Sequence, residues 1–271
     1  MRAFRVSVAK DDEDPATAVL WEAGTAGIEV RPLAEGRVEL VAYFAEAGPE
    51  LAAGLFPPGA IVERAEVPEV DWVGRFRETF KASRAGRFLV APAWDAPAER
   101  SADVLLVDPG RAFGTGTHET TRLCLQSLED LAGRRRLGRT LDLGAGTALL
   151  AVAAARLGAT PVVASDLDPE AVAASAAHAR LNDVPVRVVR ADGGRGFLPR
   201  SFDLVLANLM ALLLVDRAAE IRSLLAGGGA LVLSGLLAED VPFVREAFAA
   251  CGSPRTRLDG EWAALAYEDV R

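Results

Sequence analysis

The sequence predicts an α/β protein with a seven-stranded, mostly parallel sheet, preceded by a small α+β domain. From residue 140 onward, apolar strand-like runs alternate with helical patterns, which is typical of a parallel sheet covered by helices on both faces. Before residue 66 the order instead reads βαββαβ, which favours a ferredoxin-like fold. We therefore expect a ferredoxin-like domain at 1–65, a linker with one helix at 66–100 and the α/β domain at 101–271.

The first hundred residues carry clear start and stop signals. Asp14 and Pro15 begin a helix, and Gly36 belongs to a turn between two strands. Residues 1–65 hold 11 acidic and 6 basic side chains, so this part is either a solvated small domain or a module that recognises a basic partner. We expect strands at 3–8, 27–31, 37–44, 60–64 and 88–91, and helices at 14–23, 46–55 and 71–81.

The α/β part is expected to end in an antiparallel hairpin, because only a few residues separate its last two strands. A run of three glycines, 227–229, is expected to end a helix before the next strand. The strands are placed at 104–107, 139–143, 161–165, 185–189, 203–207, 230–234, 254–258 and 262–268, and the helices at 119–131, 148–157, 169–181, 211–225 and 238–250.

Composition excludes several classes of function. The net charge of −8 disfavours general nucleic-acid binding, so no direct DNA binding is expected. No apolar run is long enough to span a bilayer, and the first residues lack the apolar centre of a signal peptide, so we expect a cytoplasmic monomer without membrane contact. With two cysteines, Cys124 and Cys251, and two histidines, His118 and His178, neither a disulfide framework nor a metal site is expected.

A glycine turn follows the strand at 139–143. Gly144 and Gly146 lead into a helix, and the next strand ends on Asp166. This strand, turn, helix, strand and acid form half of a nucleotide-binding sheet. Glycines let the backbone approach a ligand closely, and Asp166 can accept hydrogen bonds from two ribose hydroxyls.

Asp142, two residues before the turn, narrows the choice of ligand. It would repel a pyrophosphate, but it can accept hydrogen bonds from the turn or reach an ammonium group. Leu149 stands where a dinucleotide fingerprint has its third glycine. S-adenosylmethionine, which has no phosphate and carries an amino-acid end, suits these features. Asp192, after the strand at 185–189, is either an exposed turn acid or a partner of the adenine amine.

The segment 108–121, DPGRAFGTGTHETT, is a glycine- and threonine-rich loop that opens into a helix. It offers backbone N–H groups and hydroxyls near a helix N-terminus, so we expect Phe113, Thr115 and Gly116 to contact the cofactor. His118 is either a general base for an amine or hydroxyl, or a residue that holds the loop by hydrogen bonds. We favour the second role.

Asn208 ends the strand at 203–207, and ligands of open α/β sheets bind beyond the carboxyl ends of the strands. Its side-chain carbonyl can accept a hydrogen bond from a nucleophilic amine beside the transferred methyl group. Alternatively it is a turn residue that caps the next helix. The run Asn-Leu-Met-Ala differs from the Asn-Pro-Pro-aromatic run of enzymes that methylate exocyclic base amines, which disfavours such a substrate.

Four motifs, DPGRAFGTGTHETT, LDLGAGTALLAVAAARLGA, SDLDPEAV and ANLMALL, resemble the PrmA family in order and spacing. That family methylates ribosomal protein L11. The resemblance implies a class I methyltransferase (Rossmann-like) fold behind a ferredoxin-like substrate-recognition domain. It also implies S-adenosylmethionine binding by Thr121, Gly144, Asp166 and Asn208, and repeated methylation of lysine side chains and the N-terminal α-amine. Ala148 and Leu149 occupy places that the family often gives to Gly and Val.

We therefore expect a protein N-methyltransferase whose residues 1–65 dock the basic ribosomal protein L11. Three alternatives remain open. The chain could methylate another protein lysine or a small molecule, it could bind a cofactor or the ribosome without catalysis, or it could be an NAD-linked oxidoreductase. Asp142 and the missing third glycine count against NAD.

Overall fold

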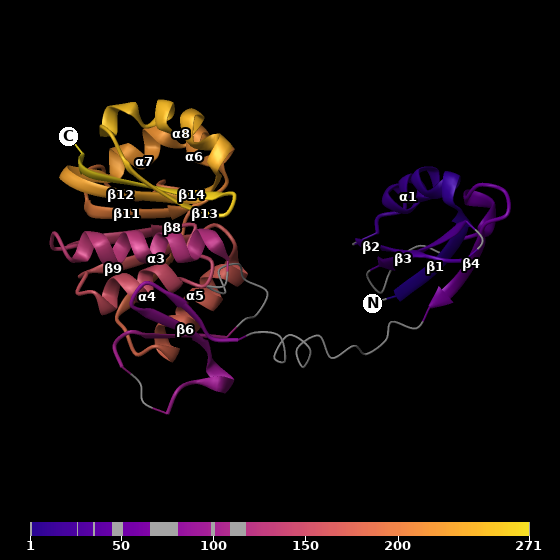
Figure 1. Ribbon diagram of the computed structural model, residues 1–271, viewed down its shortest axis with the longest axis horizontal. Helices are drawn as coiled ribbons and strands as arrows, with labels where there is room; N and C mark the ends of the chain where they lie inside the picture. The colour runs from indigo at the N-terminus through magenta and orange to yellow at the C-terminus, as the bar shows by residue number, and fades with distance from the viewer. Residues whose placement is uncertain are drawn as a thin grey trace. The chain divides into compact units, whose positions relative to one another are not determined.

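The computed structural model describes residues 2–25, 27–34, 36–44, 51–65, 81–98, 101–108 and 118–270 (Figure 1). The chain forms two compact units, residues 1–77 and 78–271, and each is described by itself. The predicted helix at 71–81, apart from its last residue, lies outside the described residues. The same is true of Phe113, Thr115 and Gly116 in the predicted loop.

The first unit contains a four-stranded sheet in the order β2-β3-β1-β4, in which all neighbours are antiparallel. Its core comprises buried side chains such as Phe4, Leu20 and Phe44. Its elements are β1 (Arg2–Ala9), α1 (Glu13–Glu22), β2 (Gly27–Pro32), β3 (Arg37–Phe44) and β4 (Ile61–Ala65).

The four strands and the first helix confirm the predicted elements of this unit. The predicted second helix, 46–55, falls partly outside the described residues, and its described part contains only the 3-10 turn Ala53–Leu55. The ferredoxin-like assignment and the division at residues 65 and 100 therefore stay predictions.

The second unit is built on a seven-stranded sheet in the order β10-β9-β8-β11-β12-β14-β13. The first five strands of that order are parallel, and β14 runs antiparallel to both of its neighbours. This confirms the predicted Rossmann-like sheet with a terminal hairpin. The strands are β8 (Thr140–Leu143), β9 (Val162–Asp166), β10 (Val186–Arg190), β11 (Phe202–Asn208), β12 (Leu225–Leu237), β13 (Arg255–Asp259) and β14 (Trp262–Val270).

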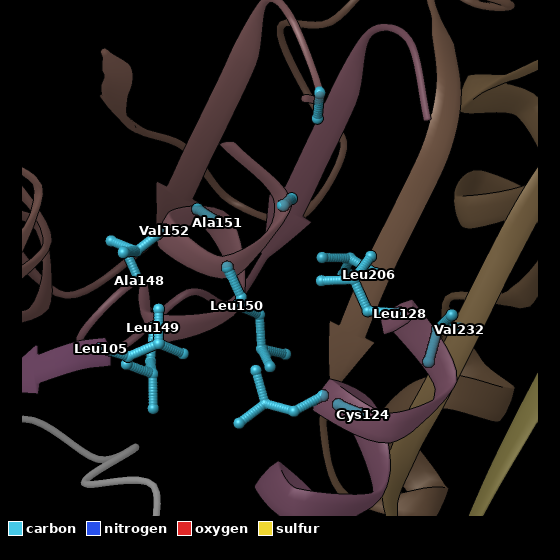
Figure 2. Close-up of a cluster of buried hydrophobic side chains, with 14 of the residues drawn as sticks. Leu105, Cys124, Leu128, Ala148, Leu149, Leu150, Ala151, Val152, Leu206 and Val232 are labelled. Atoms are coloured by element: carbon cyan, nitrogen blue, oxygen red, sulfur yellow. The ribbon is translucent and has the colours of Figure 1, made fainter. Parts of the chain in front are cut away.

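Helices cover both faces of this sheet (Figure 1). One face carries α3 (Glu119–Ala132), α4 (Leu149–Arg156) and α5 (Pro169–Leu181), and the other carries α6 (Ala211–Asp216), α7 (Ala218–Leu224) and α8 (Val241–Ala247). Successive residues of a strand point to opposite faces of the sheet. Leu206 therefore packs with α3 and α4, while Val205 packs with α6, α7 and α8 on the opposite face. Figure 2 shows the first cluster, in which Cys124 and Leu128 of α3 lie near Leu206 and Val232 of the sheet.

A second, three-stranded sheet packs against α4 and α5. It consists of β5 (Ser83–Ala85), β6 (Phe88–Pro92) and β7 (Val104–Val107), and β6 confirms the predicted strand at 88–91. At the outer edge of β7, the side chain of Asn182 hydrogen-bonds with the backbone of Leu106. Its Oδ1 accepts from Leu106 N and its Nδ2 donates to Leu106 O, both at 2.8 Å. Residues 83–92, expected in the linker, are thus part of the larger unit.

Three elements of the larger unit differ from the prediction. The glycine run 227–229 lies inside β12, because β12 already pairs with β11 from Leu225, opposite Phe202. The register shifts between Phe202 and Leu204, which accommodates Gly228 at a φ of 77°. The predicted helix at 211–225 is two helices, α6 and α7, and the one at 238–250 shortens to α8 between two 3-10 turns.

Candidate active site

The glycine turn sits at the carboxyl end of β8. The N–H groups of Gly144 and Ala145 donate to Ser165 O at 2.8 and 3.0 Å, which ties the turn to β9. Gly144 has a φ of 70°, and a Cβ there would lie 2.5 Å from Cδ2 of Leu209. Glycine is therefore favoured at this position by its conformation, and any other residue would also force the Leu209 side chain to shift.

Asp166 ends β9 beside this turn. Its Oδ2 accepts from Gly146 N at 3.0 Å, and its Oδ1 accepts from Asp168 N at 3.0 Å. A carboxylate oxygen has more than one lone pair, so both oxygens can still accept from a ligand. The structure thus brings Gly144, Gly146 and Asp166 together, as the sequence predicted.

Asp142 lies below the turn with only 2% of its surface exposed. Its Oδ2 accepts from Ala151 N, in the first turn of α4, at 2.9 Å. Burial raises the pKa of this carboxyl to about 7, against the opposing effect of the Ala151 hydrogen bond. The neighbouring Cys124 thiol has its pKa raised to about 12, first by burial and then by the charge of Asp142. The predicted acid therefore lies buried beneath the turn, and its hydrogen bond comes from the first turn of α4.

Asp192 follows β10 at the same edge of the sheet. Its oxygens form ion pairs with Arg195 and Arg217, each at 2.8 Å. An adenine amine would have to share these oxygens with two guanidinium groups. The predicted adenine contact of Asp192 remains a prediction, and the ion pairs are a structural role that the sequence did not reveal.

The N-terminus of α3 approaches the same edge from the other side of β8. His118 is the N-cap, and its Nδ1 lies 3.3 Å from Thr120 N and 2.8 Å from Thr120 Oγ1. The imidazole meets the ring of Trp262, at the start of β14, edge-on with 4.7 Å between centroids. Thr121 is 2% exposed, and its Oγ1 has no hydrogen-bond partner among the described residues. A buried hydroxyl without a partner fits a ligand-binding role.

Asn208, the last residue of β11, faces this helix end. Its Nδ2 donates to Thr120 Oγ1 at 3.2 Å, while its buried Oδ1 has no partner among the described residues. The amide therefore contacts α3 and does not cap the helix that follows it, because α6 has no side-chain cap at its N-terminus. Within the described part of the chain, Asn208 Oδ1 and Thr121 Oγ1 are thus two polar atoms without partners, on neighbouring elements at the same edge of the sheet.

Sequence analysis did not single out Thr120 or Trp262. Thr120 stands next to Thr121 in the same motif, but only the fold shows that its hydroxyl meets Asn208. The hairpin that carries Trp262 is distant in sequence from His118, so no local pattern could have predicted this ring contact.

The described part of the chain offers no group of three His, Cys, Asp or Glu side chains that could hold a metal ion. None of the helices described is both long and apolar enough to cross a membrane.

Replacing Asp142 by Asn is expected to change how stability depends on pH. Because the folded pKa of about 7 exceeds the ordinary value of 3.8, the folded protein binds a proton that the unfolded chain lacks between these values. The contribution of Asp142 to stability therefore falls as the pH rises through this window, by up to roughly 4 kcal/mol. Asn stays neutral, so the melting temperature of Asp142→Asn, measured by calorimetry, should rise relative to that of the wild type between about pH 4 and about pH 7.

Asp203→Asn is the matched control, with the opposite sign. Its hydrogen bonds to Arg139 lower the pKa of Asp203, so its contribution is present at neutral pH and is lost as the pH falls. Identical pH profiles for Asp142→Asn and the wild type would show that the raised pKa of Asp142 is wrong.

Comparison with known proteins places this chain in a family. The family model described as ribosomal protein L11 methyltransferase (PrmA) matches residues 50–269. A ribosomal protein L11 methyltransferase of Geobacter sulfurreducens is 42% identical over 207 residues, covering 75% of this chain and 68% of that protein. One of Pelobacter propionicus is 41% identical over 241 residues, covering 86% and 77%.

A solved structure supports the same assignment. The ribosomal protein L11 methylase of Lactobacillus delbrueckii subsp. bulgaricus aligns with a TM-score of 0.63 and 27% identity, covering 71% of this chain and all of that one. The family match, the two relatives and the shared fold agree with the resemblance found in the sequence motifs. The chain belongs to the PrmA family of ribosomal protein L11 methyltransferases.

Proposed function

We propose that this chain transfers methyl groups from S-adenosylmethionine to amines of ribosomal protein L11, namely lysine side chains and the N-terminal α-amine. The observation that carries the proposal is the Asn208 amide. Its Nδ2 donates to Thr120 Oγ1, and its buried Oδ1 has no partner among the described residues at the carboxyl end of β11, where a ligand of this fold binds. Family membership supports both the reaction and the acceptor.

The described residues fit S-adenosylmethionine. Gly144 allows close approach to the turn, Asp166 has free lone pairs for ribose hydroxyls, and Thr121 Oγ1 is a buried polar atom without a described partner. Asp142 contributes negative charge beneath the turn when it is ionised, which favours the ammonium end of this cofactor over a pyrophosphate. The cofactor, when bound, supplies a methyl group already activated by its sulfonium.

The protein's own part is to prepare and align the amine. A lysine amine in water has a pKa near 10.4 and is mostly protonated at neutral pH. A partly desolvated site disfavours the ammonium and so makes the neutral amine, with its nucleophilic lone pair, available. Asn208 Oδ1 accepts a hydrogen bond from one N–H of this amine. This hydrogen bond turns the lone pair of the amine nitrogen toward the methyl group. After transfer the nitrogen loses its extra proton to water.

His118 is a positioning group in this scheme rather than a base. Its Nδ1 accepts a hydrogen bond from Thr120 N, so the lone pair of this nitrogen is already used. In the neutral ring Nε2 then carries the proton. This supports the role favoured from the sequence, in which His118 holds the loop.

Residues 1–65 are proposed to dock the substrate protein. Their 11 acidic and 6 basic residues suit a basic partner. Large apolar side chains are also exposed on the described part of this unit, among them Trp21 at 55% and Ile61 at 56%. A surface that exposes both aromatic and acidic side chains is better suited to binding a protein than to binding a small molecule.

Replacing Asp166 by Ala should weaken the binding of S-adenosylhomocysteine by about 10- to 100-fold, because a charged hydrogen-bond acceptor for the ribose is lost. Isothermal titration calorimetry measures this loss. Asp168→Ala, which removes only the cap of α5 at Glu170 N, is the matched control and should bind nearly as well as the wild type. Binding of NAD by the wild type with affinity equal to that of S-adenosylhomocysteine would exclude the proposed cofactor preference.

Transfer of labelled methyl groups to purified ribosomal proteins tests the acceptor. Label should appear in ribosomal protein L11 with the wild type and fall by about 100-fold or more with Asn208→Ala. Deleting residues 1–65 should abolish labelling of the protein while S-adenosylhomocysteine still binds, and this retained binding is the control for folding. Label in a different protein, with none in L11, would contradict the proposed substrate; undiminished labelling after the deletion would contradict docking by residues 1–65.

A further inference from the structure

The hydroxyl of Thr120 joins two side chains that the proposed mechanism uses. Thr120 is 1% exposed on the first turn of α3. Its Oγ1 lies 2.8 Å from His118 Nδ1 and 3.2 Å from Asn208 Nδ2. The family resemblance assigns a role to the neighbouring Thr121, whose hydroxyl has no partner among the described residues, but it assigns none to Thr120.

The direction of these hydrogen bonds follows from the donors available. In the tautomer in which His118 Nδ1 caps α3 by accepting from Thr120 N, this nitrogen carries a lone pair and no proton. The hydroxyl proton of Thr120 must then point to Nδ1, because two acceptors cannot bond to each other without it. The lone pairs of Oγ1 are left to accept from Asn208 Nδ2.

This arrangement gives the Asn208 amide one orientation. If the amide turned over, Oδ1 would face Thr120 Oγ1, whose only proton is already given to His118. Two oxygen atoms would then meet without a hydrogen between them, which is unfavourable in a buried site. Oδ1 is therefore kept on the side away from Thr120, where it has no described partner.

The C-terminal hairpin holds the other end of this chain of contacts. The Trp262 ring packs against the His118 imidazole, and Asp259 Oδ2 accepts from Nε and Nη2 of Arg122 at 3.0 and 2.7 Å. These contacts fix the first turn of α3 against the end of β13 and the start of β14. His118 and Thr120 are thus supported from one side and meet Asn208 on the other.

We infer that Thr120 is a positioning residue for methyl transfer, whose hydroxyl sets the Asn208 amide so that Oδ1 faces the amine of the acceptor. The inference rests on the proposed function. A flipped amide would present an NH₂ group, which cannot accept a hydrogen bond from the amine N–H and would therefore misalign the lone pair of the amine. The Thr120 hydroxyl therefore affects the acceptor step and leaves cofactor binding largely unchanged.

The test compares Thr120→Val with Thr120→Ser in the full chain. Val has the shape of Thr without the hydroxyl, and Ser keeps the hydroxyl. We expect Thr120→Val to lower kcat with ribosomal protein L11 by about tenfold or more while its affinity for S-adenosylhomocysteine stays within about twofold of wild type. Thr120→Ser should keep most of the activity. Ser127→Ala, which removes a buried hydroxyl bonded to Leu123 O two turns along α3, is the control for stability and should leave kcat unchanged.

A second measurement does not depend on turnover. The chain has only two asparagines, Asn182 and Asn208, and one glutamine, Gln126, so their side-chain amides give few NMR signals. In Thr120→Val the Asn208 NH₂ protons should exchange with water faster than in the wild type, while those of Asn182, bonded to Leu106 O, should not change.

These outcomes distinguish the positioning role of Thr120 from the proposed methylation of ribosomal protein L11. If Thr120→Val keeps the kcat of Ser127→Ala, or if Thr120→Ser is as impaired as Thr120→Val, the positioning role is wrong even though L11 is methylated. If the wild type does not methylate L11, the proposed function fails, and the NMR comparison alone then decides whether Thr120 holds the amide. Equal exchange of the Asn208 amide in Thr120→Val and wild type overturns the inference in either case.

Discussion

The carboxylate of Asp166 holds the glycine turn to the end of β9, and the candidate active site depends on this contact. Gly146 N donates to one oxygen and Asp168 N to the other, so one side chain fixes the turn after β8 and the corner that begins α5. In the proposed function the same carboxylate also accepts hydrogen bonds from the ribose, so folding and cofactor binding would use one group. The turn is held to β9 by Ser165 O as well, and Gly144, which lacks a Cβ, lies close to the Leu209 side chain.

The acceptor side is supported from a different direction. Asn208 ends β11, but its amide is set by α3, which is in turn braced by Asp259 and Trp262 of the C-terminal hairpin. In the proposed mechanism the antiparallel end of the sheet therefore supports the residues that align the acceptor, in addition to closing the core. Leu209 links the glycine turn to β12. Its N–H donates to Ser234 O at 3.0 Å, and its side chain packs over Gly144.

Much of this could be predicted because parallel strands put their carboxyl ends on one edge. Gly144, Asp166 and Asn208 each follow a recognisable strand, so sequence alone brought them together. Thr120 could not be found this way, since its partner Asn208 is 88 positions away and the choice between two adjacent threonines depends on the rotation of α3. The glycine run 227–229 was misread because local propensity favours a break, whereas pairing with β11 extends β12 through it.

The measurement that tests the central claim most directly is the intact mass of ribosomal protein L11 after incubation with the enzyme and S-adenosylmethionine. The account predicts that the mass of L11 rises in steps of one methyl group as the reaction proceeds, and that these steps disappear with Asn208→Ala. An L11 mass that stays unchanged, while the enzyme converts S-adenosylmethionine to S-adenosylhomocysteine with another amine, would contradict it.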